Sequence, residues 1–269
     1  MRIHAIQTGT VQVRTRQRQG SGPGPLRPLL TMADRHWTEP LPIYAWLVEH
    51  DDGPILVDTG ETARATERGY FPRWHPYYRL AVRFDVRPED ELGPQLERLG
   101  VGVRDIRSVV MTHLHTDHAG GLHHVRDREI LVTRQELSDT EGFAGKVGGY
   151  LRDRWPADAN LTPIDLEERA YGPFERSVEL AGGVHLVATP GHTPGHMSVV
   201  VDGDRPTVLA GDVSYTEELM LQGATDGVSP NPRQAADTIR RMKQFVTESN
   251  ATYLPSHDPG GAARLPTIT

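Results

Sequence analysis

Short apolar runs separated by turn-forming residues dominate the hydrophobic pattern of the chain. Runs of this length, bounded by Gly, Pro, Asn, Asp or Ser, are typical of β-strands. We therefore predict strands at 1–14, 42–50, 54–58, 106–112, 129–133, 184–189, 197–202, 207–210 and 251–255. Apolar residues recur instead every three or four positions within 232–248, which predicts an amphipathic helix. A shorter helix is predicted over 88–100, which opens with Pro88 and closes with Gly100.

Several of the predicted strands are almost continuously apolar, which indicates sheets that are covered on both faces. Strands outnumber helices, and the segment 134–180 has no dominant pattern. No internal repeat or linker divides the chain, and 269 residues suffice for one large core. We predict an α/β protein with helix-covered sheets, built as a single domain over 1–269.

The composition is that of a globular protein, with 37% hydrophobic and 24% charged residues. The absence of Cys excludes disulfides, a thiolate nucleophile and Cys-ligated metal sites. A net charge of -7 argues against a nucleic-acid backbone as the main partner. No run approaches the roughly 20 apolar residues of a membrane span, and the N-terminus lacks the apolar stretch of a signal peptide. We therefore expect a cytoplasmic protein that binds neither nucleic acid nor a membrane.

The strongest chemical motif is the segment 113–118, HLHTDH, which directly follows a predicted strand. Imidazole nitrogen and carboxylate oxygen are good ligands for zinc and similar divalent ions. His113 and His115 alternate in an extended segment, so their side chains face the same side. Asp117 and His118 reach that side if the chain turns, and the glycines that follow favour a turn. The motif predicts a metal site.

Three further candidate ligands each follow an apolar run by one to four residues. They are His192, Asp212 and His257. Each one taken alone is a weak candidate, because single His and Asp residues are common at strand ends. All three occur in order after the first motif, and each is predicted to lie at the end of a strand. Together they indicate one composite site.

The pattern HxHxDH…H…D…H resembles that of the metallo-β-lactamase superfamily, and the match extends over residues 43–257. The resemblance implies an αββα sandwich with metals at one edge of the two sheets. It also implies that one metal is held by three imidazoles, that a second is held by two imidazoles and a carboxylate, and that one carboxylate bridges them. In this chain those ligands are His113, His115 and His192, then Asp117, His118 and His257, with Asp212 as the bridge.

Within the superfamily the chain is most similar to the N-acyl-homoserine lactonase group. The similarity lies in its size, in segment 113–121 and in segment 212–215, where Tyr215 follows the bridging Asp212. Antibiotic-degrading members typically lack the bridging Asp, and many use a Cys at the second metal. Glyoxalase II-like thioesterases carry a helical C-terminal extension, whereas only 12 residues follow His257 here. Flavodiiron proteins need a flavin domain, for which this length leaves no room.

The resemblance implies a small-molecule lactone substrate and two divalent metal ions, with zinc expected first and cobalt, iron or manganese as alternatives. A hydroxide shared by the two ions would attack the lactone carbonyl. Tyr215 would hydrogen-bond the carbonyl oxygen, and Asp117 would carry a proton to the leaving ring oxygen. Two alternatives stay open: Tyr215 packs at the sheet edge, and Asp117 acts only as a ligand.

Other functions on the same scaffold also stay open. The substrate is then a different lactone, a thioester or a phosphodiester. A metal-dependent binding protein on a decayed enzyme fold is a third hypothesis, which the complete set of seven ligands argues against. A homodimer is expected from the resemblance.

Two polar residues near the ligands are assigned supporting roles. Asp58 ends a predicted strand, and a carboxylate behind a ligand loop orients an imidazole by accepting its second N–H. His196 shares the run 189–196 with His192 but has no independent support as a ligand, so we expect a structural role.

Two segments have unassigned functions. Residues 15–28 are basic and rich in Gly and Pro, which favours a solvated arm. Residues 70–84 hold six aromatics and are interpreted as a pocket wall, a subunit interface or a loop folded on the core. Met32 and Trp37 are weaker candidates for the same wall.

Overall fold

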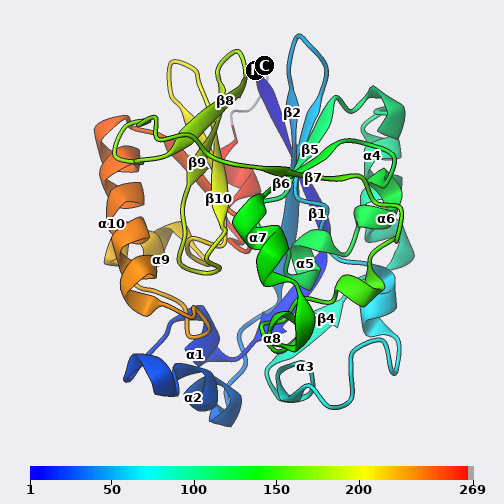
Figure 1. Ribbon diagram of the computed structural model, residues 1–269, viewed down its shortest axis with the longest axis vertical. Coiled ribbons are helices and arrows are strands. Elements are labelled where there is room, and N and C mark those ends of the chain that lie inside the picture. Colours follow the sequence, from blue (N-terminus) through cyan, green and yellow to red (C-terminus); the bar gives the residue numbers. More distant parts are fainter. Residues whose placement is uncertain (266–269) are drawn as a thin grey trace.

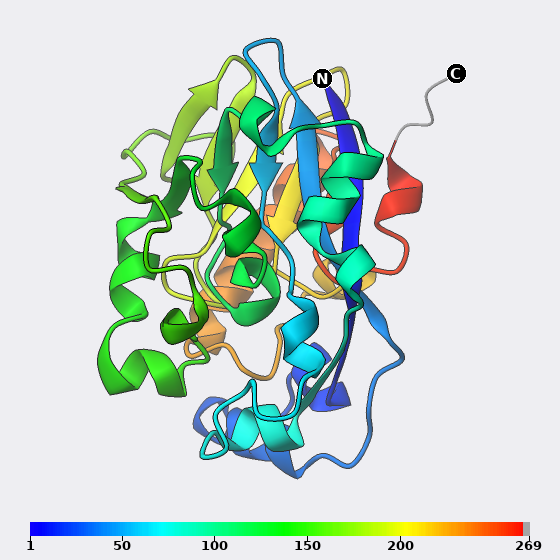
Figure 2. The same ribbon diagram turned by 90° about the vertical axis from the view of Figure 1, so that its right-hand side faces the viewer.

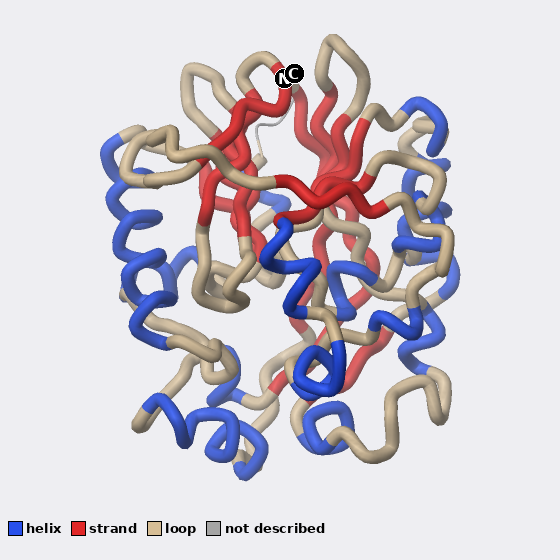
Figure 3. Tube along the Cα trace, in the orientation of Figure 1, coloured by secondary structure: helices blue, strands red, loops and turns tan. Residues whose placement is uncertain are grey.

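The computed structural model describes residues 1–265 and consists of two β-sheets packed face to face, with helices on both outer faces (Figure 1, Figure 3). The first sheet has seven strands in the order β4-β1-β2-β3-β5-β6-β7, and the second has five in the order β12-β11-β10-β9-β8. The predicted α/β class and αββα sandwich are thus confirmed.

The strands of the first sheet are β1 (Arg2–Val13), β2 (Leu41–Glu49), β3 (Ile55–Val57), β4 (Val82–Asp85), β5 (Ser108–Val110), β6 (Ile130–Thr133) and β7 (Leu161–Ile164). Those of the second are β8 (Ser177–Ala181), β9 (Val184–Ala188), β10 (Met197–Val201), β11 (Thr207–Gly211) and β12 (Thr252–Pro255). The helices are α1 (Thr15–Arg18), α2 (Arg27–Ala33), α3 (Pro76–Leu80), α4 (Leu92–Arg98), α5 (Thr116–Ala119), α6 (Leu122–Val125), α7 (Arg134–Asp139), α8 (Gly142–Val147), α9 (Glu217–Gln222) and α10 (Pro232–Glu248).

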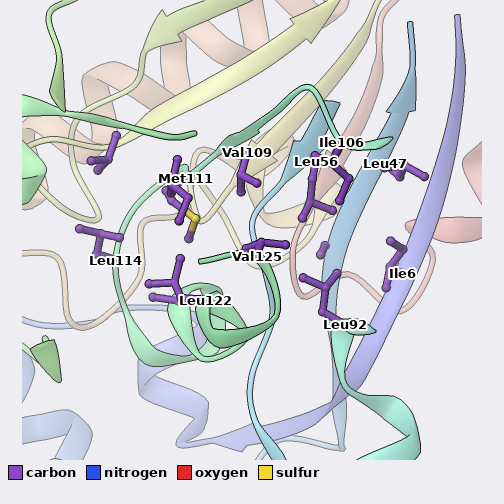
Figure 4. Packing of buried hydrophobic residues seen from close by; sticks show 14 of the residues in the cluster. Ile6, Leu47, Leu56, Leu92, Ile106, Val109, Met111, Leu114, Leu122 and Val125 are labelled. Carbon is purple, nitrogen blue, oxygen red and sulfur yellow. The ribbon is translucent and has the colours of Figure 1, made fainter. Parts of the chain in front are cut away.

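Burial on both sheet faces explains why the central strands are continuously apolar. In β2, Ala45 and Leu47 point to the outer face, where they join the cluster under α4 and α6 (Figure 4). Trp46 and Val48 point to the inner face, where they pack against the second sheet. Because successive side chains of a strand alternate between faces, a strand covered on both sides needs apolar residues at every position.

The three strands that the sequence pattern fails to predict, β4, β7 and β8, all lie at sheet edges. An edge strand needs fewer apolar residues because one side of it faces solvent. In β7 every residue is only partly buried, and the strand contains Pro163. Proline is tolerated there because an edge strand does not need every N–H for pairing.

The predicted solvated arm at 15–28 is wrong. This segment forms α1 and the start of α2, which lie beside α3 at one end of the molecule (Figure 1, Figure 2). The Gly20 N–H donates to the Thr225 carbonyl at 2.8 Å, and the Arg27 guanidinium donates to the Thr225 hydroxyl at 2.7 Å. The Gln17 side chain is buried. Hydrogen bonds to a distant loop hold the segment in place, and local composition does not reveal them.

No helix within residues 1–265 is long and apolar enough to cross a membrane.

The helix α10 covers the outer face of the second sheet, and this packing can be tested by mutation. Met242 is fully buried against the second sheet, with Ile239 and Phe245 beside it. We expect Met242→Ala to lower the free energy of unfolding by about 2–5 kcal/mol, because it removes buried contacts and leaves a cavity. Arg240→Ala, an exposed change on the same helix, should stay within about 0.5 kcal/mol of the parent protein. Equal losses in urea unfolding for the two variants would contradict this packing.

Candidate metal centre

The residues predicted as ligands follow strands whose carboxyl ends share one edge of the sandwich. β3 and β5 run parallel in the first sheet, and β11 and β12 run parallel in the second. Both β9 and β11 pair antiparallel with β10, so β9 points the same way as β11. The chain reaches His113 after β5, His192 after β9, Asp212 after β11 and His257 after β12. Strand direction therefore brings ligands that are distant in sequence to one edge.

All seven predicted ligands meet in groups whose donor atoms lie within 4.8 Å of one another. These groups are His113, His115 and His192; Asp117, His118 and His257; and His113, His118 and Asp212. The Asp212 carboxylate lies between the first two groups. Its Oδ1 is 3.4 Å from Nε2 of His118 and 3.4 Å from Nε2 of His257, and its Oδ2 is 3.5 Å from Nε2 of His192.

All five imidazoles use one ring nitrogen to hydrogen-bond the surrounding protein. The bonds run from His118 Nδ1 to Asp58 at 2.8 Å, from His257 Nδ1 to the Pro42 carbonyl at 2.9 Å, from His192 Nδ1 to Asp226 at 3.0 Å, from His113 Nδ1 to the Thr112 hydroxyl at 3.1 Å and from His115 Nε2 to the Gly148 carbonyl at 3.2 Å. The other nitrogen of each ring faces the centre. These outer partners fix the orientation of each ring.

The atoms that face the centre fit a divalent cation. Nε2 of His113, Nε2 of His118 and Oδ1 of Asp212 are buried and have no hydrogen-bond partner among the described residues. Nδ1 of His115 and Nε2 of His192 are 3.0 Å apart, although each ring already donates through its other nitrogen. Two such nitrogens approach closely only with a proton or a metal ion between them. A set of nitrogen and oxygen donors without thiolate suits zinc, cobalt, iron and manganese.

Asp58 holds His118 from behind, as predicted. Its Oδ2 accepts from His118 Nδ1 and from the Thr112 hydroxyl, and its Oδ1 accepts from the Thr112 N–H at 2.7 Å. The backbone of Asp58 is left-handed, with φ 59°. Asp tolerates this conformation better than most residues do, and the tight turn points its carboxylate at the ligand loop.

His196 has a structural role, as predicted. Its Nε2 accepts from the backbone N–H of Asp212 at 3.0 Å, and its Nδ1 lies 2.9 Å from the Thr189 hydroxyl. Burial lowers the pKa of His196 to about 3, so the ring stays neutral and keeps this accepting nitrogen. The ring thereby fixes the position of Asp212 without pointing at the centre.

Sequence reasoning missed Glu136, which joins two of the ligand loops. Its Oε1 accepts from the Leu114 N–H at 3.0 Å, and its Oε2 accepts from the Thr193 hydroxyl at 2.6 Å. Glu136 is three residues after Thr133, which caps α7. That spacing is typical of a capping box and predicts a local role for the glutamate, not a long-range one.

Asp226 was missed as well. Its Oδ2 accepts from His192 Nδ1 and from the Ser229 hydroxyl, and its Oδ1 accepts from the Val228 and Ser229 N–H groups. In sequence the dipeptide Asp226-Gly227 indicates only a turn. The turn is present, and its carboxylate also orients a ligand.

A further group of Glu91, His123 and His124 lies apart from the centre. Glu91 Oε2 is 2.7 Å from His124 Nε2 and 3.1 Å from His123 Nε2, while its Oε1 accepts from the Ala63 N–H at 2.8 Å. These contacts tie α6 to the turn at 62–66. The two imidazoles had no support as ligands of the predicted centre, and they do not join it.

A cavity of about 560 Å³ opens beside the centre. His115, Asp117, His192, Asp212 and Tyr215 form its inner wall. Its outer wall includes Trp74, Tyr77, Tyr78 and Phe84 from segment 70–84, together with Met32. The pocket-wall interpretation of segment 70–84 is therefore confirmed for these residues. Trp37 does not line the cavity but packs between the guanidinium groups of Arg14 and Arg83.

A helix-covered sandwich with a buried His- and Asp-rich centre at its sheet edge is the architecture of a metal-binding protein. Residues 38–257 match the model of the metallo-beta-lactamase superfamily. The chain belongs to this superfamily, as its motif resemblance implied.

Similar sequences carry a common name. An N-acyl homoserine lactonase of a Bacillus species is 29% identical over 221 residues, which cover 81% of this chain and 82% of that protein. The N-acyl homoserine lactonase AttM of Rhizobium radiobacter is 27% identical over 237 residues, which cover 84% of this chain and 85% of that protein.

Solved structures share the fold. The structure of a Bacillus thuringiensis AiiA variant with N-decanoyl-L-homoserine at its active site has a TM-score of 0.77 at 23% identity, and the match covers 99% of this chain and 96% of that one. AidC, described as a dizinc quorum-quenching lactonase, has a TM-score of 0.67 at 15% identity over 96% of this chain and 87% of its own.

Metal affinity should depend on pH, because protons and metal compete for the same nitrogens. Burial alone would lower the pKa of His192, but the carboxylates of Asp226 and Asp212 outweigh it and raise the pKa to about 9. His192 is therefore protonated in metal-free protein at neutral pH. The apparent affinity for Zn²⁺ should rise from pH 6 to pH 9, by roughly tenfold per pH unit for each proton displaced. Chelator-competition titrations measure this, and a flat profile would contradict it.

Proposed function

We propose that this chain is a metal-dependent hydrolase that opens the lactone ring of N-acyl-homoserine lactones. The observation that carries the proposal is that the Tyr215 side chain lines the same cavity as the metal-ligand candidates. The tyrosine ring stacks on that of His257, with centroids 5.3 Å apart. The names of the similar sequences support the same reaction class.

The proposed centre holds two divalent ions. Zinc is the metal expected first at both positions. His113, His115 and His192 would hold one, Asp117, His118 and His257 the other, and Asp212 would bridge them. When bound, the ions supply a Lewis acid for the lactone carbonyl and an activated water for the attack. The ligand geometry described above supports this division.

Asp117 is proposed to move the proton. The attacking water loses a proton as its oxygen bonds to the carbonyl carbon, and the ring oxygen gains one as its bond to that carbon breaks. The Asp117 side chain lines the cavity, and its Oδ2 is 3.5 Å from His257 Nε2. A carboxylate that reaches both the substrate space and the centre can carry a proton between them. Pure ligation by Asp117 is the alternative.

Tyr215 is proposed to donate to the carbonyl oxygen. Burial raises the pKa of its phenol well above the ordinary value, and nearby Tyr77 and Asp212 raise it further. The hydroxyl therefore keeps its proton at neutral pH and can donate it to an oxygen that gains negative charge during the attack.

The character of the cavity favours an uncharged substrate. Among the described residues that line it, none is Lys or Arg, and the outer wall is mostly aromatic and aliphatic. A phosphodiester or nucleic acid would have only the proposed metal centre to receive its negative charge, because no Lys or Arg lines the cavity to bind further phosphate oxygens. Assays with homoserine lactones, other lactones, thioesters and bis-nitrophenyl phosphate test the proposal. Preference for a thioester or phosphate diester would refute it, and no turnover of any would favour the binding-protein alternative.

The expected homodimer and cytoplasmic location stay predictions. Light scattering on purified protein tests the first, and cell fractionation tests the second.

Metal stoichiometry tests the proposed centre directly. We expect about two divalent ions per chain in active, metal-replete protein. Asp212→Asn should weaken both sites together, since the amide brings no negative charge to either ion. Elemental analysis after dialysis gives the number for both proteins. One ion per chain in the active parent protein would defeat the two-ion proposal.

Replacement of Tyr215 by phenylalanine separates catalysis from ligation. Tyr215→Phe should lower kcat/KM by about 5- to 150-fold, toward the lower end because the metal also polarises the carbonyl. Metal content and thermal stability should hardly change. His115→Ala is the matched comparison and should lose metal and nearly all activity together. An unchanged rate for Tyr215→Phe on several lactones would show that Tyr215 only packs.

A further inference from the structure

A single buried amide joins two phenols at the cavity wall. Gln17 Nε2 is 2.7 Å from the Tyr77 hydroxyl oxygen and 2.9 Å from that of Tyr215, and it donates to both. Gln17 comes from α1, Tyr77 from α3 and Tyr215 from the loop after β11. All three side chains line the cavity that contains Asp117 and Asp212. The contact thus joins three separate parts of the chain at the proposed substrate site.

The direction of these hydrogen bonds leaves both phenol protons free. A phenol has one proton to donate, and its oxygen can also accept. Each oxygen accepts from Gln17, and neither hydroxyl donates to a protein acceptor within residues 1–265. Since each phenol oxygen accepts from the Gln17 amide, the proton of each hydroxyl is available to donate to a cavity ligand.

The backbone of Gln17 is fixed independently of this contact. Its carbonyl accepts from the Gly227 N–H at 2.8 Å, in the turn whose Asp226 orients His192. A side chain at Gly227 would overlap the Arg16 carbonyl, so this close approach requires glycine. The amide is thus presented from a position that is locked to the metal-ligand scaffold.

We propose that Gln17 is a positioning residue that aims both hydroxyls at the substrate, and that Tyr77 is a second substrate hydrogen-bond donor beside Tyr215. This rests on the proposed lactonase function. An N-acyl-homoserine lactone has two carbonyl groups whose carbons are separated only by the ring α-carbon and the amide nitrogen. Two hydroxyls held by one nitrogen match this pair. The Tyr215 hydroxyl donates a hydrogen bond to the ring carbonyl oxygen, and the Tyr77 hydroxyl donates one to the amide carbonyl oxygen.

The decisive variant is Gln17→Glu. It keeps the shape of the side chain but replaces the NH2 group that donates to the phenols with a carboxylate oxygen that accepts from them. A carboxylate accepts both phenol protons and so removes them from the substrate. We expect kcat/KM for N-acyl-homoserine lactones to fall by about 10- to 100-fold, at least as far as in Tyr215→Phe. Gln17→Leu frees the phenols without capturing their protons, so its loss should be smaller, about 2- to 10-fold. Unchanged activity in Gln17→Glu would overturn the proposal, because the phenols would then already donate to residue 17.

Two controls show whether the effect of Gln17→Glu comes from the lost positioning of the phenols, from the added negative charge or from altered packing. In a Tyr77→Phe/Tyr215→Phe background, Gln17→Glu should change kcat/KM by no more than about twofold, since no phenol proton remains to capture. A further large loss there would assign the effect to charge and refute the positioning role. Metal content, measured on the same preparations, should match the parent protein, whereas Gln17→Glu in the double-phenylalanine background should be less stable to heat, because its buried carboxylate has no phenol to accept from.

Substrate comparison tests the assignment of Tyr77. Tyr77→Phe should lower kcat/KM for N-acyl-homoserine lactones but not for a γ-lactone without an amide. Tyr215→Phe should lower it for both. Equal losses for the two substrates in Tyr77→Phe would overturn the pairing of Tyr77 with the amide carbonyl.

A substrate-free measurement keeps the test independent of the lactonase proposal. A phenol that begins to donate to a carboxylate shifts its near-ultraviolet absorption to longer wavelength. The difference spectrum of Gln17→Glu against the parent protein should show this shift, and Gln17→Leu should not. If the parent protein opened no lactone, the lactonase proposal would fail while the spectrum still decided the hydrogen-bond direction. Absence of the shift would refute the role of Gln17.

Discussion

Gathering five imidazoles and two carboxylates at one sheet edge, all of them buried except the partly buried His115 and Asp117, costs free energy, because each group loses water that the protein only partly replaces. Hydrogen bonds from the outer nitrogen of each ligand imidazole to the surrounding protein offset part of this cost. Asp58, Asp226 and the carbonyls of Pro42 and Gly148 each take one N–H of a ligand imidazole. The atoms left over face the centre, where a cation compensates them. The arrangement of the surrounding loops follows from this requirement.

The loops that carry the ligands are also tied to one another. Glu136 joins the loop after β5 to the loop after β9, and His196 holds the backbone that carries Asp212. Such contacts keep donor atoms in place before a metal arrives, so little reorganisation is needed on binding. Because ligands must also lose protons, metal uptake, pH and the stability of these loops are coupled.

The metal centre and the outer cavity wall are built from different kinds of structural element. The ligands lie at the ends of buried strands, whereas the outer wall comes from surface segments that include α1, α2, α3 and α8. Surface segments can change with little effect on the core, so they are suited to setting substrate preference. Gln17 connects the two parts, because it contacts the wall residue Tyr77 and, through its backbone, the turn that orients His192.

The sequence by itself determined the central strands, the helices α4 and α10 and the seven ligand candidates, because burial on both faces and ligand spacing leave local patterns. It did not reveal the edge strands β4, β7 and β8, which contain partly buried or exposed residues. It also did not reveal Glu136, Asp226 or Gln17, which resemble a helix cap, a turn and a loop residue in local sequence. Their partners are distant, with Gln17 and Tyr215 separated by 198 positions. Hydrogen bonds of this kind impose no periodicity on the chain, so only the tertiary structure decides them.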